Sequence, residues 1–238
     1  MKTKIGGKTC YIYDCGSSDM LLIQPVDDHD IEVLDSEVAE IARLAGGRGF
    51  TLAAFKVDDW NADLSPWEAP PVFGSEGFAG GAAETLKYVT EQLIPELTGV
   101  TSSKGTTDGL RAALPEDTKI YIGGYSLAGF FALWAAYQTD LFRGAAAASP
   151  SVWFPGWVGY AESNAIKADK VYLSLGDKEE KTRNPVMRTV GDCIRRQLEI
   201  LQADPACEEC TLEMNQGNHF KEPGIRTAKG FAWLIKEK

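Results

Sequence analysis

The sequence contains no long apolar run. No stretch of its 238 residues approaches the ~18 apolar residues of a membrane span. The start, MKTKIGGKTCYIYDCG, has basic residues but lacks the apolar segment of a signal peptide. We therefore expect a cytoplasmic protein that does not enter the membrane.

Cysteine is scarce, and its positions form no recognisable set. The chain has five cysteines, an odd number, and no export signal, which argues against a disulfide framework. The motif CEEC at 207–210 has the spacing of half a zinc site, but no second Cys pair or Cys/His pair accompanies it. Because an acidic surface loop explains the motif at least as well, we expect no bound metal. The serine chemistry considered below needs no metal or organic cofactor either.

Blocks of positive charge are missing as well. The 24 Lys and Arg residues and 34 Asp and Glu residues give a net charge of −10, and the acidic excess is spread along the chain. Proteins that bind nucleic acid usually carry clustered Lys and Arg. A nucleic-acid partner is therefore not expected.

The sequence does contain a regular alternation of short apolar, β-rich runs with helical patterns. With 44% hydrophobic residues it can bury one sizeable core, and we expect a single domain over residues 1–238. The alternation predicts an α/β fold, with a mostly parallel sheet and helices on both faces. The expected strands cover residues 20–24, 50–57, 119–124, 143–149, 170–177 and 211–216.

Caps and breakers mark the ends of several expected helices. A short amphipathic helix over residues 35–46 follows the first strand, after a turn at QPVDD. A second periodic pattern starts at Ala82 and should end at Pro95, because proline breaks a helix interior. A third helix should begin with Asn184 as its cap and Pro185 as its first residue.

Two segments lack any period. Residues 58–81 are rich in Pro, Gly and Trp and predict a long loop, which in a compact domain tends to be functional. Residues 98–109 are polar and are the segment that we expect to be least ordered.

The stretch GGYSLAG turns from an apolar run directly into a helical pattern. Ser126 lies at this corner, with Gly124 two residues before it and Ala128 two residues after it. Small residues at these positions allow a strained turn that projects a serine hydroxyl at the carboxyl edge of the sheet, where open α/β sheets bind ligands. The alternative interpretation is a tight strand–helix crossover in which Ser126 is the helix N-cap.

A nucleophilic serine needs a base and an acid that orients the base. Of the two histidines, His219 follows the last expected strand, whereas His29 is flanked by three aspartates that suit a solvated loop. The acid should follow the strand between serine and histidine. Glu179, three residues after a glycine, is the first choice there, and Asp177 and Glu180 are the alternatives.

Two backbone amides should form an oxyanion hole. One belongs to Leu127, the residue after the serine, and the other to the loop that follows the strand at 20–24. Pro25 has no amide hydrogen, so Val26 is the first choice and Asp27 the next, although QPVDD is also compatible with an ordinary turn.

Five segments carry a resemblance to a known family: DLSPW (63–67), GGYSLAGFFALWAA, ASPSVWF (148–154), LSLGDKEEK and GNHFKEPGIRTAKGFAWL. They resemble the esterase D-like family of the α/β-hydrolase superfamily, which includes siderophore esterases, feruloyl esterases and mycolyltransferases. The resemblance covers most of the chain and implies an α/β-hydrolase fold. This chain departs from the larger members, because only KTCYIYDCG precedes the strand at 20–24, so we expect a reduced N-terminal hairpin and no large cap domain. It also implies hydrolysis of carboxylic esters, with Ser126 as nucleophile, His219 as general base and then acid, and Glu179 in the place of the triad acid. Some members resemble Ser–His dyads, so the role of an acid stays open.

Aromatic side chains are concentrated near the expected carboxyl edge of the sheet. They predict an apolar or sugar-binding pocket for a small-molecule ester, and packing of a lid on the domain is the alternative. The residues concerned are Trp60, Trp67, Phe73, Phe78, Trp153, Phe154 and Trp157. Two other functions stay open at this point: an acyltransferase that uses the same nucleophile, and a non-catalytic binding module on a hydrolase scaffold.

Overall fold

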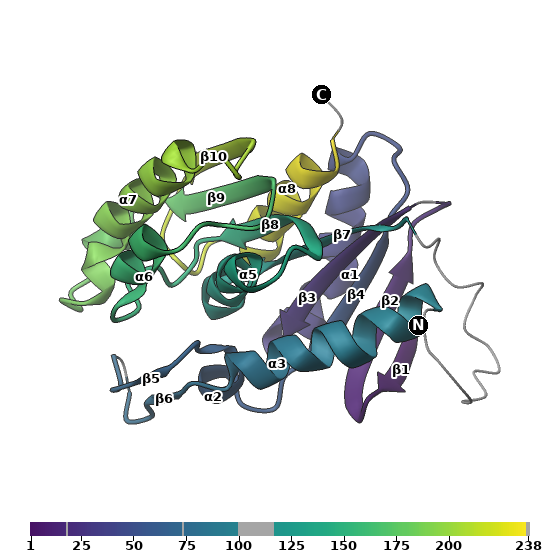
Figure 1. The fold of residues 1–238 in the computed structure, drawn as a ribbon, viewed down its shortest axis with the longest axis horizontal. Helices are drawn as coiled ribbons and strands as arrows, with labels where there is room; N and C mark the ends of the chain where they lie inside the picture. The colour runs from purple at the N-terminus through teal and green to yellow at the C-terminus, as the bar shows by residue number, and fades with distance from the viewer. Residues whose placement is uncertain (18, 73, 100–116, 237–238) are drawn as a thin grey trace.

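The computed structural model describes residues 1–17, 19–72, 74–99 and 117–236, which leaves most of the segment at 98–109 outside the described residues. An eight-stranded sheet runs through the molecule in the order β1-β2-β4-β3-β7-β8-β9-β10 (Figure 1). The six strands from β4 to β10 in this order are parallel, whereas β2 is antiparallel to both of its neighbours. The strands are β1 (Lys2–Ile5), β2 (Lys8–Asp14), β3 (Met20–Val26), β4 (Thr51–Lys56), β7 (Lys119–Tyr125), β8 (Phe142–Ala148), β9 (Lys170–Gly176) and β10 (Glu209–Asn215). The α/β fold predicted from the sequence is confirmed.

Helices cover both faces of the sheet (Figure 1). One face carries α1 (Asp28–Leu44) and α8 (Pro223–Ile235), which pack against each other. The other carries α3 (Ala82–Tyr88), α5 (Ser126–Gln138), α6 (Trp157–Ser163) and α7 (Val190–Ala203). Two separate clusters of buried apolar side chains lie between these layers and the sheet.

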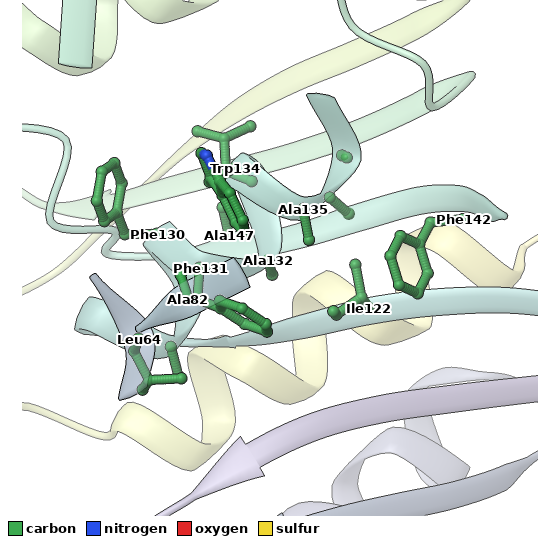
Figure 2. Packing of buried hydrophobic residues seen from close by; sticks show 14 of the residues in the cluster. Leu64, Ala82, Ile122, Phe130, Phe131, Ala132, Trp134, Ala135, Phe142 and Ala147 are labelled. Atoms are coloured by element: carbon green, nitrogen blue, oxygen red, sulfur yellow. The ribbon is translucent and has the colours of Figure 1, made fainter. Parts of the chain in front are cut away.

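The helix α5 is buried on almost every side. Nearly all of its residues are apolar, and it lies on β7 and β8. Four consecutive alanines at the end of β8, all fully buried, give the helix a flat surface to approach. Figure 2 shows Phe131 and Ala132 of α5 in one cluster with Ile122 of β7 and Leu64. This packing fixes the start of α5, where Ser126 lies.

The strand β3 leads into the helix α1 with almost no loop. β3 continues to Val26, and Asp27 forms a reciprocal capping box with Asp30, so that α1 begins at Asp28. The helix therefore starts seven residues before the predicted one, because the acidic residues assigned to a turn are its cap and first turn. His29 lies in this first turn and is exposed.

The helix that begins at Ala82 does not end at Pro95. A π-helical turn, Val89–Leu93, follows α3, and the chain then continues as α4 (Ile94–Thr98) before Gly99 in the left-handed region ends it. Pro95 lies in the first turn of α4, where its missing N–H is tolerated. The predicted helix end at Pro95 is wrong, because the π-helical turn is followed directly by a new helix whose first turn tolerates a proline.

Two further local predictions need correction. Asn184 accepts hydrogen bonds from the amides of Val186 and Met187, but it caps only a short turn, and α7 begins at Val190. The long segment at 58–81 contains a short helix, α2 (Trp60–Leu64), and a small antiparallel pair, β5 (Glu68–Ala69) and β6 (Phe78–Ala79).

The N-terminal hairpin is short rather than absent. β1 has four residues and is joined to β2 by Gly6 and Gly7, both at positive φ. Within the described residues, no helix combines the length and the apolar character needed to span a membrane.

Candidate active site

Four neighbouring strands bring the candidate residues together. Ser126 follows β7, Ser149 follows β8, Glu179 lies three residues after β9, and His219 lies four residues after β10. Because β7, β8, β9 and β10 are parallel and adjacent, their carboxyl ends meet at one edge of the sheet. Residues that are 93 positions apart in the chain, such as Ser126 and His219, are thereby in contact.

Ser126 has a strained backbone, with φ of +56°. A Cβ at Gly124 would lie 2.7 Å from the Cβ of Ala128, so the corner has room for a methyl group at 128 only because residue 124 is glycine. Ser126 is the first residue of α5, and its side chain does not cap the helix. The interpretation of Ser126 as an N-cap is therefore wrong, and its hydroxyl points to His219 instead.

The imidazole of His219 lies between the serine and an acid. Its Nε2 is 3.0 Å from Ser126 Oγ, and its Nδ1 is 2.7 Å from Glu179 Oε2. The side chain of His219 is 24% exposed and that of Glu179 only 4%, so water can reach the histidine from one side. This row of three groups has the geometry that activates a serine hydroxyl.

Glu179 is buried but well supplied with donors. Its Oε1 accepts hydrogen bonds from the Gly176 amide at 2.7 Å and from Ser149 Oγ at 2.8 Å, in addition to the contact of Oε2 with His219. Burial alone would raise the pKa of this carboxyl, but the hydrogen bonds and the nearby His219 hold the pKa below its ordinary value. The group is therefore a carboxylate near neutral pH.

The two alternative acids have other partners. Asp177 Oδ1 accepts from the amide of Gly217 at 2.7 Å and so holds the loop that carries His219. Glu180 is exposed and pairs with Arg195 at 3.1 Å. Of the three acidic residues, Glu179 is the one whose carboxylate contacts the imidazole.

The predicted oxyanion donors differ in their placement. Leu127 is buried in the first turn of α5, directly after Ser126, and that turn has no side-chain cap. Val26 is the last residue of β3, is paired with Lys56 of β4, and accepts from the Val57 amide through its carbonyl. The Asp27 amide donates to Asp30 within the capping box. The loop expected to present the second amide is therefore missing, because β3 passes directly into the cap of α1.

A cavity of about 420 Å³ opens beside Ser126 and is mainly apolar. Its size is in the range of small-molecule sites. It is lined by Trp60, Asn61, Phe78, Ser126, Leu127, Ser151, Trp153, Thr182, Met187, His219 and Phe220. A second cavity of about 390 Å³ shares Trp153, Thr182, Met187, His219 and Phe220 with it and extends past Glu179.

Three further predicted aromatic residues, Trp67, Phe154 and Trp157, do not line the cavity beside Ser126. Trp67 packs against Phe154 and Tyr160, and its Nε1 donates to the Pro155 carbonyl at 2.9 Å. Trp157 is fully buried and donates to Gln197. Phe154 is buried in the same cluster, and Phe73 lies outside the described residues.

Three residues at the site were not recognised from the sequence. Arg226 is 2% exposed and contacts Glu179. Tyr125 donates its hydroxyl hydrogen to the His219 carbonyl at 2.6 Å. Phe220 is 86% exposed beside His219 and lines both cavities. The sequence does contain a signal that Arg226 is buried. Arg226 lies four residues before Gly230 and eight before Leu234, and this spacing puts all three on the buried side of α8.

The cysteines of the CEEC motif are free thiols. Burial and the neighbouring Cys210 raise the pKa of Cys207 to about 12. Across the part of the chain that the structure describes, no group of three or more His, Cys, Asp or Glu side chains is arranged to hold a metal ion.

Comparison with known proteins gives a likeness in structure but not in sequence. No family model matches the chain, and no curated protein sequence matches it. Siderophore hydrolase EstA from Aspergillus nidulans has a TM-score of 0.71 and 19% identity, over 95% of this chain and 89% of that one. An IroE-like serine hydrolase from Shewanella oneidensis has a TM-score of 0.72 and 14% identity, over 96% and 75%. Siderophore hydrolase EstB from Aspergillus nidulans has a TM-score of 0.67 and 15% identity, over 98% and 92%.

These identities are low, so the likeness concerns the fold. The matches cover 95–98% of this chain. The chain therefore shares its fold, a mostly parallel sheet with helices on both faces, with these hydrolase structures.

Proposed function

We propose that the protein is a serine hydrolase that cleaves a carboxylic ester of a small molecule. The observation that carries the proposal is the row Ser126–His219–Glu179, with contacts of 3.0 Å and 2.7 Å at the carboxyl edge of the sheet. An exposed serine without such neighbours is a poor nucleophile. The fold shared with siderophore hydrolases supports the same reaction class.

In the proposed first half-reaction, Ser126 Oγ attacks the ester carbonyl carbon while His219 Nε2 takes the hydroxyl proton. Glu179 stabilises the imidazolium that forms and keeps Nδ1 protonated. The tetrahedral intermediate then collapses, the bond to the alcohol oxygen breaks, and His219 gives its proton to that oxygen. The product is an alcohol and an acyl group bound to Ser126.

In the second half-reaction a water molecule attacks the acyl-enzyme, with His219 again as the base. The partial exposure of His219 supports water, rather than a second alcohol, as the acceptor of the acyl group. The acid product leaves and Ser126 recovers its proton. This argument favours a hydrolase over an acyltransferase.

The negative charge on the carbonyl oxygen needs donors during both half-reactions. The Leu127 amide at the start of α5 is the proposed donor, and removing one such donor lowers kcat by about 100- to 1000-fold in comparable enzymes. The predicted second donor is the amide of Val26, the last residue of β3, whose carbonyl accepts from the Val57 amide.

The apolar cavity indicates the kind of ester. Trp60, Phe78 and Trp153 give it a mainly aromatic wall, which suits an apolar or aromatic substituent next to the ester bond. The proposed substrate is therefore a small ester with such a substituent. Siderophores, which the names of two similar structures give as the molecules they hydrolyse, belong in the first screen.

The test is hydrolysis of short-chain p-nitrophenyl esters by the wild type, Ser126→Ala and His219→Ala, together with labelling by a fluorophosphonate probe. Loss of kcat in both variants, with labelling of the wild type at Ser126, is the expected result. His29→Ala is the matched control, because His29 is exposed on α1 and should keep full activity. A folded wild type that neither hydrolyses esters nor reacts with the probe would overturn the proposal in favour of a binding module.

A further inference from the structure

Arg226 is a buried cation within the site. It projects from the first turn of α8 and is 2% exposed, although arginine is almost never fully buried unless it is paired. Its Nη1 lies 2.8 Å from Glu179 Oε1, which is the carboxylate oxygen that faces away from His219. The acid thus has the histidine on one oxygen and the arginine on the other.

The same guanidinium also holds the loop that carries His219. Its Nη2 donates to the carbonyls of Asn218 at 3.0 Å and Gln216 at 3.3 Å. These residues precede His219 in the loop between β10 and α8. One side chain therefore connects the acid to the backbone of the histidine loop.

Two hydroxyl groups complete this arrangement. Arg226 Nη1 lies 3.1 Å from both Tyr125 Oη and Ser149 Oγ. The Tyr125 hydroxyl donates to the His219 carbonyl, and the Ser149 hydroxyl donates to Glu179. The guanidinium of Arg226 packs closely on the backbone at the end of β9, since a Cβ built on Gly176 would lie 2.9 Å from Arg226 Nη1.

We propose that Arg226 is a positioning residue that fixes Glu179 and the His219 loop relative to each other, so that His219 stays in line with Ser126. The inference rests on the proposed function for its kinetic consequences and on the contacts above for its geometry. A planar guanidinium is suited to this role, because its fork of donors reaches a carboxylate and backbone carbonyls at the same time. A lysine ammonium at this position would satisfy fewer of these acceptors.

The kinetic test compares Arg226→Met and Arg226→Lys with the wild type, with rates expressed per site that reacts with the fluorophosphonate probe. We expect kcat to fall about 100-fold in Arg226→Met with KM little changed, because the substrate cavity is intact while the base is displaced. The kcat of Arg226→Lys should be about 10-fold higher than that of Arg226→Met, since lysine restores the positive charge but not the fork of guanidinium donors. Arg195→Met, at an exposed ion pair, is the matched control and should leave kcat unchanged.

A second variant avoids the risk that Arg226→Met does not fold. Tyr125→Phe removes one hydroxyl and should lower kcat several-fold without preventing folding. The double variant Glu179→Gln/Arg226→Met should be no slower than the slower single variant, because both residues act through the same imidazole. Multiplication of the two separate losses would overturn the proposal.

A measurement without turnover separates this inference from the proposed function. In protein labelled with ¹⁵N-histidine, the wild type should show a slowly exchanging N–H signal from His219 Nδ1, because that nitrogen contacts a buried carboxylate. The exposed His29 should show none, and His219→Ala identifies the signal. We expect the signal to be lost in Arg226→Met and partly retained in Arg226→Lys.

The results have distinct meanings. If the wild type hydrolyses no ester and takes up no probe, the proposed function fails, and the ¹⁵N signal still decides the role of Arg226. If Arg226→Met lowers only the melting temperature, with kcat per labelled site and the His219 signal unchanged, the residue is merely structural and the inference is overturned.

Discussion

Glu179 and Glu37 are both buried next to the start of α8, yet their surroundings differ. Glu179 contacts Arg226, His219, Ser149 and the Gly176 amide. Glu37 belongs to α1 and lies against α8. A Cβ built on Gly224 of α8 would be 3.2 Å from Glu37 Oε2. Among the described residues its Oε1 has no hydrogen-bond partner.

The two environments shift the carboxyl groups in opposite directions. Burial, together with the charge of Asp30, raises the pKa of Glu37 to about 8, although a hydrogen bond with Gln24 opposes the shift in part. At Glu179, burial also acts to raise the pKa, but the donors around it reverse the direction. Burial alone therefore does not make a carboxyl group useful for catalysis, and the supply of donors decides its charge.

The largest expected difference concerns activity. Glu179→Gln should lower kcat by about 10³- to 10⁴-fold, as loss of the acid does in comparable triads, because the imidazolium loses its stabilising charge. Glu37→Gln, the same substitution at the other buried carboxyl, should leave kcat unchanged. Both are measured as kcat on a p-nitrophenyl ester. A fall of less than about 10-fold in Glu179→Gln would mean that serine and histidine suffice as a dyad.

The next effect concerns stability between about pH 5 and about pH 8. The pKa of Glu37 in the folded protein lies above its ordinary value of 4.5, so its contribution is fully present below that value and is lost as pH rises through about 8. From about pH 5 to about pH 8 the free energy of unfolding should fall by a few kcal/mol in the wild type and by clearly less in Glu37→Gln. Urea unfolding across this range is the measurement.

Asp30 provides the control for that experiment. Burial raises the pKa of Asp30 to about 6, so it titrates within the same range. Asp30→Asn should therefore remove the lower part of the pH dependence and also weaken the upper part, because the charge of Asp30 helps to raise the pKa of Glu37. Equal slopes in the wild type and both variants would show that neither carboxyl is responsible.

A smaller effect is expected at acid pH. Because the pKa of Glu179 is lowered on folding, its contribution to stability is present above its ordinary value of 4.5 and is lost as pH falls through the lowered value. The wild type should therefore lose more stability in that range than Glu179→Gln does. Thermal unfolding followed from about pH 6 down to about pH 3 checks this, and a parallel loss in both proteins would contradict it.

The smallest effect separates Glu179 from the nearby alternative acid. Asp177 holds the Gly217 amide rather than the imidazole, and the amide oxygen of asparagine can still accept that hydrogen bond. Asp177→Asn should therefore lower kcat by no more than about 3-fold. A loss in Asp177→Asn as large as that in Glu179→Gln would mean that the acid was assigned to the wrong residue.

Most of the site could be placed from the sequence because it depends on strand ends. The apolar runs before Ser126, Glu179 and His219 are short and bounded, and parallel strands bring their ends to one edge. The start of α1 and the passage of α3 beyond Pro95 could not be placed in this way. A capping box and a π-helical turn, which override the usual break signals, decide both.

The aromatic residues also separate what the sequence predicts from what only the tertiary structure decides. Their positions after expected strands predicted that the segments around Trp60, Trp67 and Trp153 lie near the site. Only the packing decides which of these side chains line the cavity. Trp60 and Trp153 line the cavity, whereas Trp67 packs on Phe154. The side chain of Trp67 is directed by a hydrogen bond to Pro155, 88 residues away in the chain.

The sequence by itself determined the order of the elements and the residues that follow each parallel strand, because apolar periodicity and the Gly124–Ser126–Ala128 corner are local properties. Only the tertiary structure decided which of three nearby acids faces His219, and that Arg226 lies buried against it. These choices depend on hydrogen bonds between the loops after β9 and β10 and on the packing of α8, which join residues up to 101 positions apart.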